Sequence, residues 1–248
     1  MSLKRHIPNT LTSLNLLSGC FAVYFAFHQQ FNYAAYAVFL AAVFDFFDGF
    51  TARLLKVSSP IGKELDSLAD MVTFGVAPAM VAFNFLMNFN GQGIFQSFPW
   101  LVFTPFIIAV FSGLRLAKFN IDTRQTSSFI GMPTPANALF WVSLPLIHYF
   151  PTENEMIKTV FSFFLNPTVI LVNSILFSYL LVAELPLFAL KFKSFGWAGN
   201  EVKFIFLITC GILLAWLKLL AIPFIIILYL LISIIIHLFN KKKNEIQS

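Results

Sequence analysis

The chain has 248 residues, of which 58% are hydrophobic and only 11% are charged, and its mean hydropathy is +0.82. Soluble domains carry about 25% charged residues, so this composition excludes an ordinary soluble enzyme and indicates an all-α, polytopic membrane protein. The formal net charge is +5. Because the basic residues lie at the ends of apolar segments, we attribute this charge to membrane topology and to anionic lipid, and we expect no nucleic-acid partner.

A membrane-spanning helix needs about 20 mostly apolar residues. Reading along the chain in this way, we predict eight spans within a single domain that occupies residues 1–248. The last two spans come from one apolar run that is too long for one helix, and Lys218 and Pro223 mark the expected turn. The predicted spans are 11–29, 34–56, 64–88, 98–121, 134–150, 168–190, 203–217 and 220–239.

Lysine and arginine set the orientation of these spans, because both residue types remain on the cytoplasmic side. With the N-terminus inside, every Lys and Arg except Lys158 and Lys218 falls in a cytoplasmic segment. An even number of spans is required to keep the C-terminal lysines on the same side. We therefore predict that both termini are cytoplasmic and that the protein is integral to a membrane, most simply a bacterial inner membrane.

Four aspartates interrupt the second and third apolar segments. Asp45 and Asp48 are three residues apart, and Asp66 and Asp70 are four apart, so each pair shares one face of a helix. A charged side chain at bilayer depth costs about 2.5–3.5 kcal/mol even on lenient insertion scales. Because the connection at 57–63 is short, the two helices should be antiparallel neighbours. We expect the four acids to converge in one cavity that faces the cytoplasm.

Carboxylate oxygens are the ligands that Mg²⁺, Mn²⁺ and Ca²⁺ prefer, and four carboxylates suffice for a pair of ions that clamps a phosphoryl group. Gly49, Ala52 and Gly62 remove side-chain bulk where a ligand must approach the backbone. Arg53 adds a cation for a phosphate or an acid. The alternative is that the acids pair with nearby lysines and arginines and merely join two helices, but the interleaved small residues favour a metal site.

The spacing D-x2-D-G-x2-A-R-x8-G-x3-D-x3-D resembles the signature of the CDP-alcohol phosphotransferase family at all eight defined positions. The resemblance implies a membrane enzyme with a six-helix core, here about residues 7–190, and it leaves an additional helical hairpin at about 203–239. It also implies a homodimer. The implied reaction transfers a substituted phosphate from a CDP-linked donor to an alcohol and releases CMP.

The same resemblance implies a role for each position of the signature. Asp45, Asp48 and Asp66 would bind divalent metal, either Mg²⁺ or Mn²⁺ and two ions per site. Asp70 would also contact metal and would act as the general base. The four remaining positions, which would lie beside the nucleotide and its diphosphate, are Gly49, Ala52, Arg53 and Gly62.

Four further stretches resemble the phosphatidylserine synthase branch of this family, which joins CDP-diacylglycerol to L-serine. Two small departures from that branch are Lys118, where arginine is frequent, and Met132, where leucine is frequent. The stretches are IPNTLTSLNLLSG at 7–19, DMVTFGVAPA at 70–79, GLRLAKFNID at 113–122 and FIGMPTPANA at 129–138.

A pocket for serine needs a cation for the carboxylate and oxygen acceptors for the ammonium group. Arg115 and Asn120, at the cytoplasmic end of the fourth span, are our candidates for acceptor binding. The alternative for Arg115 is a snorkelling residue that sets topology, and the alternative for Asn120 is an ordinary residue at a helix C-terminus.

Two other functions remain open at this point. A sister enzyme would use glycerol 3-phosphate or an inositol phosphate and would need a basic cluster, which Arg115, Lys118 and Arg124 could form. A cation or proton transporter also uses buried carboxylates, but it would spread them across the membrane midplane, often within an internal repeat. Five of the 11 acidic residues crowd into 45–70, and the sequence shows no repeat.

Overall fold

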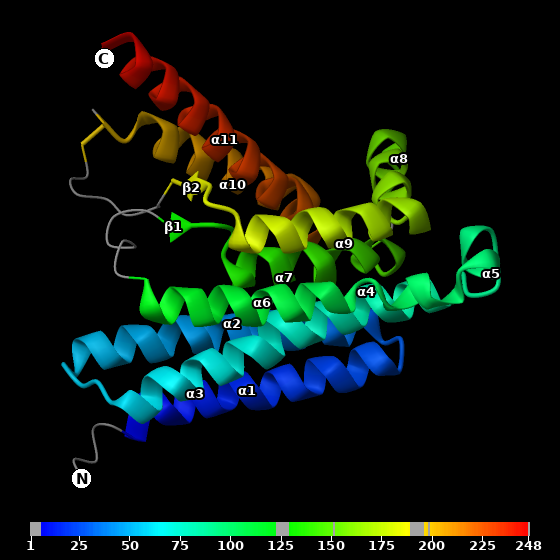
Figure 1. Ribbon diagram of the computed structural model, residues 1–248, viewed down its shortest axis with the longest axis horizontal. Helices are drawn as coiled ribbons and strands as arrows, with labels where there is room; N and C mark the ends of the chain where they lie inside the picture. The colour runs from blue at the N-terminus through cyan, green and yellow to red at the C-terminus, as the bar shows by residue number, and fades with distance from the viewer. Residues whose placement is uncertain (1–5, 123–128, 151, 189–195, 198, 248) are drawn as a thin grey trace.

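The computed structural model describes residues 6–122, 129–150, 152–188, 196–197 and 199–247. Almost all of this part of the chain is helical, which confirms the all-α class (Figure 1). Two short strands, β1 (Phe129–Ile130) and β2 (Pro186–Leu187), pair in antiparallel fashion. The helices are α1 (His6–Phe27), α2 (Phe31–Leu54), α3 (Pro60–Asp70), η2 (Met71–Val76), α4 (Ala77–Met87), α5 (Ile94–Ser97), η3 (Pro99–Phe103), α6 (Phe106–Ile121), α7 (Thr134–Ser143), η4 (Leu144–His148), α8 (Glu155–Phe164), α9 (Pro167–Val182), α10 (Glu201–Leu217), η5 (Lys218–Ala221) and α11 (Ile222–Gln247).

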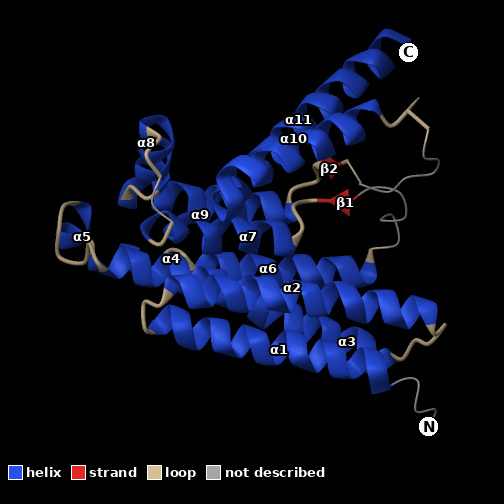
Figure 2. Cartoon of the chain, turned by 180° about the vertical axis from the view of Figure 1, so that it is seen from behind, coloured by secondary structure: helices blue, strands red, loops and turns tan. Residues whose placement is uncertain are grey.

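Within the described residues, five helical segments are long and apolar enough to cross a membrane. Helices α8 and α9 are bent by 68° at their junction, and they form a sixth such segment if they are counted as one span. One of the five, Glu201–Phe239, has 39 residues, which is far more than one crossing needs. It breaks at η5, where Lys218 has a φ of 52°, and α10 and α11 then lie side by side as a hairpin (Figure 2). The polytopic class is confirmed, and the number of eight spans stays a prediction.

The sixth predicted span, 168–190, ends earlier than its hydropathy indicates. Helix α9 stops at Val182, and Ala183 is already extended with a ψ of 142°. Pro186 follows, and a proline disfavours helix both at its own position and at the residue before it. The chain instead forms β2, whose Pro186 is opposite Ile130 of β1. This pairing joins the end of α9 to the segment that precedes α7.

Small residues let α1 and α2 pack closely along their length. Ala22 and Ala26 of α1 and Ala34 and Ala35 of α2 are completely buried, and α1 also packs against α3, η2 and α4. Gly19 marks a close approach to η2, because a Cβ atom at this position would collide with the Thr73 hydroxyl. Helix α1 is thereby held against the two helices that carry the acids.

The third span begins at a well-capped N-terminus. Ser59 accepts a hydrogen bond of 2.9 Å from the Gly62 backbone N–H, and Pro60 occupies the first helical position, where its missing N–H is not needed. The helix then runs through the π-helical turn η2, which begins directly after Asp70, and continues as α4. Single π turns are rare in helices overall, but those that occur often lie at functional sites.

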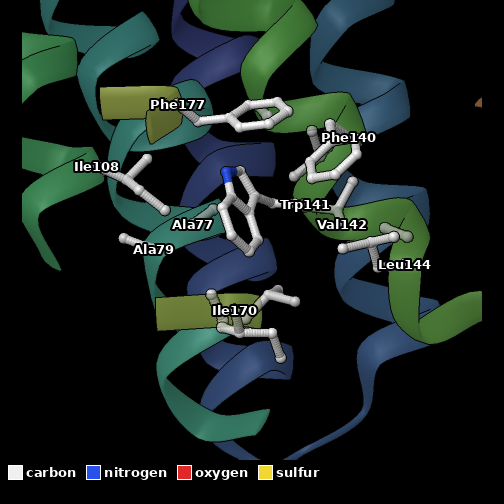
Figure 3. Close-up of a cluster of buried hydrophobic side chains, with 14 of the residues drawn as sticks. Ala77, Ala79, Ile108, Phe140, Trp141, Val142, Leu144, Ile170 and Phe177 are labelled. Atoms are coloured by element: carbon white, nitrogen blue, oxygen red, sulfur yellow. The ribbon is translucent and has the colours of Figure 1, made fainter. Parts of the chain in front are cut away.

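An aromatic core lies where α4, α6, α7 and α9 meet (Figure 3). The Phe140 and Phe177 rings stack with centroids 4.3 Å apart, and Trp141 is 2% exposed. The Trp141 indole N–H donates to Asn137 Oδ1 at 3.1 Å, so its one polar group is satisfied despite its burial. Ile108 of α6 is part of this cluster. The core therefore sets the position of α6, which carries Arg115.

We expect Gly19→Ala to destabilise the protein, because the added methyl group must displace Thr73 or separate α1 from η2. The thermal unfolding midpoint in detergent should fall by several degrees, which corresponds to about 1–3 kcal/mol. Gly211→Ala is the matched control, since Gly211 lies in α10 and nothing lies within 4 Å of a Cβ placed there. That variant should be neutral or slightly more stable. An unchanged midpoint for Gly19→Ala would contradict the close approach.

Candidate functional site

Helices α2 and α3 bring the four aspartates together, as the spacing predicts. One carboxylate oxygen from each of Asp45, Asp48 and Asp66 lies within 4.8 Å of the others. Asp70, one turn after Asp66 on α3, is close enough to Asp45, Asp66 and Asp48 for direct electrostatic repulsion. The convergence of the acids is therefore observed, and their individual roles stay predictions.

Hydroxyl and amide donors of α1, not basic side chains, contact these acids. The Thr12 hydroxyl donates to Asp48 Oδ2 at 2.6 Å, and Asn15 Nδ2 donates to Asp70 Oδ1 at 3.2 Å. Across the part of the chain that the structure describes, none of the four carboxylates forms an ion pair with a lysine or arginine. The arrangement therefore argues against the alternative in which salt bridges to these acids merely join two helices.

A cavity of about 260 Å³ lies between α1, α2, the 55–59 connection and the first turns of α3. Asp48 and Asp66 line it, together with three of the small residues of the signature, Gly49, Ala52 and Gly62. A Cβ atom on Gly62 would come within 3.0 Å of the Asn9 amide oxygen. Gly62 therefore allows Asn9 of α1 and the capping Ser59 hydroxyl to approach α3 closely at the edge of the cavity.

The fourth residue predicted to lie beside the nucleotide, Arg53, occupies the last turn of α2 and is exposed. It does not belong to the lining of the cavity. Its guanidinium nitrogen Nη1 lies 3.4 Å from the point where a Cβ on Gly49 would be, so the side chain reaches back along α2 towards the cavity.

Arg115 is 8% exposed, although it lies in a spanning helix. Its Nη1 donates to the Thr134 hydroxyl at 3.5 Å, its guanidinium carbon lies 5.3 Å from the centre of the Phe119 ring, and its charge acts on Asp70. A snorkelling arginine would instead extend to the membrane surface. Arg115 is therefore buried within the bundle, where its charge acts on Asp70 of the acid cluster.

Asn120, the second candidate for acceptor binding, joins α6 to α3. Its Nδ2 donates to the Ser67 hydroxyl at 2.8 Å, and its backbone carbonyl accepts a 2.9 Å hydrogen bond from Lys63 Nζ. Asn120 is not among the residues that line the cavity. Its amide is thus already engaged in a helix–helix contact, and its role towards an acceptor stays a prediction.

Sequence reasoning did not assign the donors on α1 to the site. Asn9 and Thr12 line the cavity, and Asn15 contacts Asp70. A signal was present, because these three polar residues recur at intervals of three around the start of the first predicted span and so lie on one side of a helix. The partners of that face come from 36 and 55 residues away, which a pattern within one helix does not reveal.

The donor set fits a divalent cation. The three oxygens of Asp45, Asp48 and Asp66 are hard ligands, they lie close together, and their negative charges are not balanced by a bound lysine or arginine in the described residues. Mg²⁺ and Mn²⁺ prefer such ligands and bring the charge that such a cluster requires.

Comparisons with known proteins show the family of this chain. The family model of CDP-alcohol phosphatidyltransferase matches residues 5–190. A CDP-diacylglycerol–serine O-phosphatidyltransferase of Bacillus subtilis is 32% identical over 181 residues, which cover 73% of this chain and 88% of the relative. An enzyme with the same name from Helicobacter pylori is 34% identical over 173 residues, covering 68% and 70%. Another from Methanocaldococcus jannaschii is 35% identical over 136 residues, covering 55% and 58%.

The matched range contains all four aspartates, the cavity and Arg115, whereas α10 and α11 lie beyond its end. The apolar spans agree with the membrane location of such enzymes. The eight-residue signature, the converged acids and the matches over most of the chain thus lead to one conclusion. The chain belongs to the CDP-alcohol phosphatidyltransferase family of metal-dependent membrane transferases.

Proposed function

We propose that this protein transfers the phosphatidyl group from CDP-diacylglycerol to L-serine, giving phosphatidylserine and CMP. The observation that carries the reaction class is the convergence of four carboxylates next to a cavity lined with small residues. Serine as the acceptor is supported by the names of the relatives and by a buried arginine beside the acids.

In the proposed reaction, the hydroxyl oxygen of serine forms a bond to the phosphorus atom of the phosphatidyl group. The bond between that phosphorus and the oxygen of CMP breaks, and CMP leaves with the electron pair. Asp70 takes the proton from the serine hydroxyl, because a carboxylate within hydrogen-bonding reach can act as general base. Arg115 binds the serine carboxylate through charge-assisted hydrogen bonds.

The proposed metal ligands are Asp45, Asp48, Asp66 and Asp70, which would bind two Mg²⁺ or Mn²⁺ ions. When bound there, such ions would supply positive charge next to the diphosphate and the departing nucleotide. Gly49, Ala52 and Gly62 leave room for the nucleotide in the cavity, and the Arg53 guanidinium pairs with a phosphate at its edge. In this assignment α2 and α3 each contribute two metal ligands.

We further propose that the site opens to the cytoplasm and that the protein acts as a homodimer in a bacterial inner membrane. The distribution of Lys and Arg supports this orientation. The start of α1, the end of α11 and the connection between α2 and α3 lie at the same end of the helix bundle (Figure 1), where the cavity is also found. A soluble acceptor such as serine would reach the lipid-linked donor from that side.

The other two functions have less support. A phosphorylated acceptor would need a cluster of cations, but Arg115 is buried and Lys118, one turn further along α6, is exposed, and Arg124 lies outside the described residues. Membership of a transferase family argues against a transporter.

The acceptor can be identified with purified protein, CDP-diacylglycerol in mixed micelles and Mg²⁺ or Mn²⁺. We expect release of CMP and formation of phosphatidylserine with labelled serine, and no product with glycerol 3-phosphate or an inositol phosphate. Chelation of the divalent ions should abolish turnover, and their re-addition should restore it. Product with glycerol 3-phosphate alone would overturn the serine assignment but keep the reaction class.

Removing the charge of Arg115 should weaken the binding of serine. We expect Arg115→Gln to raise KM for serine by about 10- to 100-fold, which corresponds to losing a charged hydrogen-bond partner worth about 1.5–3 kcal/mol. KM for CDP-diacylglycerol should change little. Lys118→Gln is the matched control, because Lys118 lies on the same helix but is exposed, and it should keep the KM of the wild type. Equal effects of the two variants would refute the assignment.

The roles of two acids can be separated by kinetics. Asp70→Asn should lower kcat by about 10²- to 10⁴-fold, because the amide cannot accept the proton, while Mn²⁺ binding followed by electron paramagnetic resonance should persist in weakened form. Asp48→Ala should also raise the metal concentration needed for half-maximal activity. Full turnover in Asp70→Asn would show that another group is the base.

A further inference from the structure

Asn15 of α1 connects the acid cluster to the rest of the bundle. Its side chain is completely buried, and Nδ2 donates to Asp70 Oδ1 at 3.2 Å. Its backbone carbonyl accepts a 3.2 Å hydrogen bond from the Thr73 hydroxyl. Asn15 therefore contacts the last residue of α3 and the π-helical turn η2 that follows it.

The oxygen of the Asn15 side-chain amide has no hydrogen-bond partner among the described residues. Within the described part of the chain, Asn15 Oδ1 is buried and has no hydrogen-bond donor. An unsatisfied buried carbonyl of this kind costs about 1–3 kcal/mol, and an apolar residue of the same shape would avoid that cost. Turning the amide over would place its oxygen against a carboxylate oxygen, so the contact with Asp70 determines its orientation.

Thr12 provides a comparison on the same helix. It lies three residues before Asn15, its hydroxyl donates to Asp48 Oδ2 at 2.6 Å, and the Pro8 carbonyl oxygen lies 3.1 Å from the same hydroxyl oxygen. Thr12 lines the cavity, but neither Asn15 nor Asp70 does. Helix α1 thus supplies one donor to an acid of α2 that lines the cavity and one donor to an acid of α3 that does not line it.

We propose that Asn15 is a positioning residue for the acceptor step: its amide occupies one oxygen of Asp70 and orients the other towards the alcohol that attacks. This inference rests on the proposed role of Asp70 as general base. The unsatisfied Asn15 carbonyl then lowers stability, because the reaction requires the amide to face Asp70. Such a loss of stability in favour of activity is common at functional sites.

The test is Asn15→Leu, which keeps a similar volume and removes the donor. We expect kcat with serine to fall by about 10- to 100-fold, with KM for CDP-diacylglycerol and the Mn²⁺ concentration for half-maximal activity changed by less than about twofold. The thermal unfolding midpoint should change little, since the loss of the unsatisfied carbonyl offsets the loss of the donor to Asp70. A residue that only supports the fold would give the opposite pattern, with a lower midpoint.

Asn84→Leu is the matched control. Asn84 is also a buried asparagine, with an unsatisfied Nδ2 in the described structure, but it lies in α4, 14 residues or about 21 Å of helix rise beyond Asp70. This variant should keep kcat. If Asn15→Leu does not fold, Asn15→Ala replaces it, because alanine is accommodated throughout α1 and α2, and the same fall in kcat is expected.

The outcomes distinguish this inference from the proposed function. An unchanged kcat in Asn15→Leu, or a loss of activity that accompanies a lowered unfolding midpoint in both Asn15 variants, overturns the positioning role. If the wild type does not convert serine, or if Asp70→Asn retains full turnover, the proposed function itself fails. Full activity of Asn15→Leu together with an inactive Asp70→Asn would refute only the positioning role.

Discussion

Repulsion among four carboxylates inside an apolar helix bundle is the constraint on which the arrangement of this protein depends. Two unit charges about 5 Å apart repel by about 3 kcal/mol at the effective dielectric constant of a protein near its surface. In the described structure no lysine or arginine is paired with any of the four acids. The helices that carry them must therefore be held together by contacts elsewhere, and α1 provides most of those contacts to the acid-bearing pair. Helix α1 packs through Gly19 against Thr73. On the same helix, the side chains of Thr12 and Asn15 donate hydrogen bonds to two of the acids.

The aromatic core contributes to the site indirectly. Trp141, Phe140 and Phe177 fill the space between α7 and α9 and pack against α6 (Figure 3). Helix α6 then continues to the end of the bundle where the acids lie, and it carries Arg115 to a position from which its charge acts on Asp70. A positive charge is thus buried near the negative cluster without forming an ion pair with it. Such a cation remains free to bind an anionic group that enters between them.

Local periodicity was enough to predict much of the site. The intervals of three and four residues within the acid pairs place each pair on one face of a helix, and a short connection makes the two helices neighbours. The contacts of Thr12 and Asn15 could not be predicted in this way, because the register of α1 against α2 and α3 depends on the packing of small residues over its whole length. The same limit applies to the end of α9, where apolar composition continues towards residue 190 but Pro186 and the pairing of β2 with β1 end the helix at Val182. The π turn after Asp70 also has no clear signal in composition.

The two sides of the acid cluster differ in a way that fits the proposed chemistry. Asp48 and Asp66 face the cavity with the small residues of the signature, whereas Asp70 contacts Asn15 and lies within the influence of the buried Arg115. In an in-line displacement at phosphorus, the attacking oxygen approaches from the side opposite the leaving oxygen. A nucleotide in the cavity would therefore leave on the side of Asp48, and the alcohol would attack from the side of Asp70. In the proposed function the base and the acceptor-binding cation act on that second side, where one oxygen of Asp70 accepts from Asn15 and the charge of the buried Arg115 acts on Asp70.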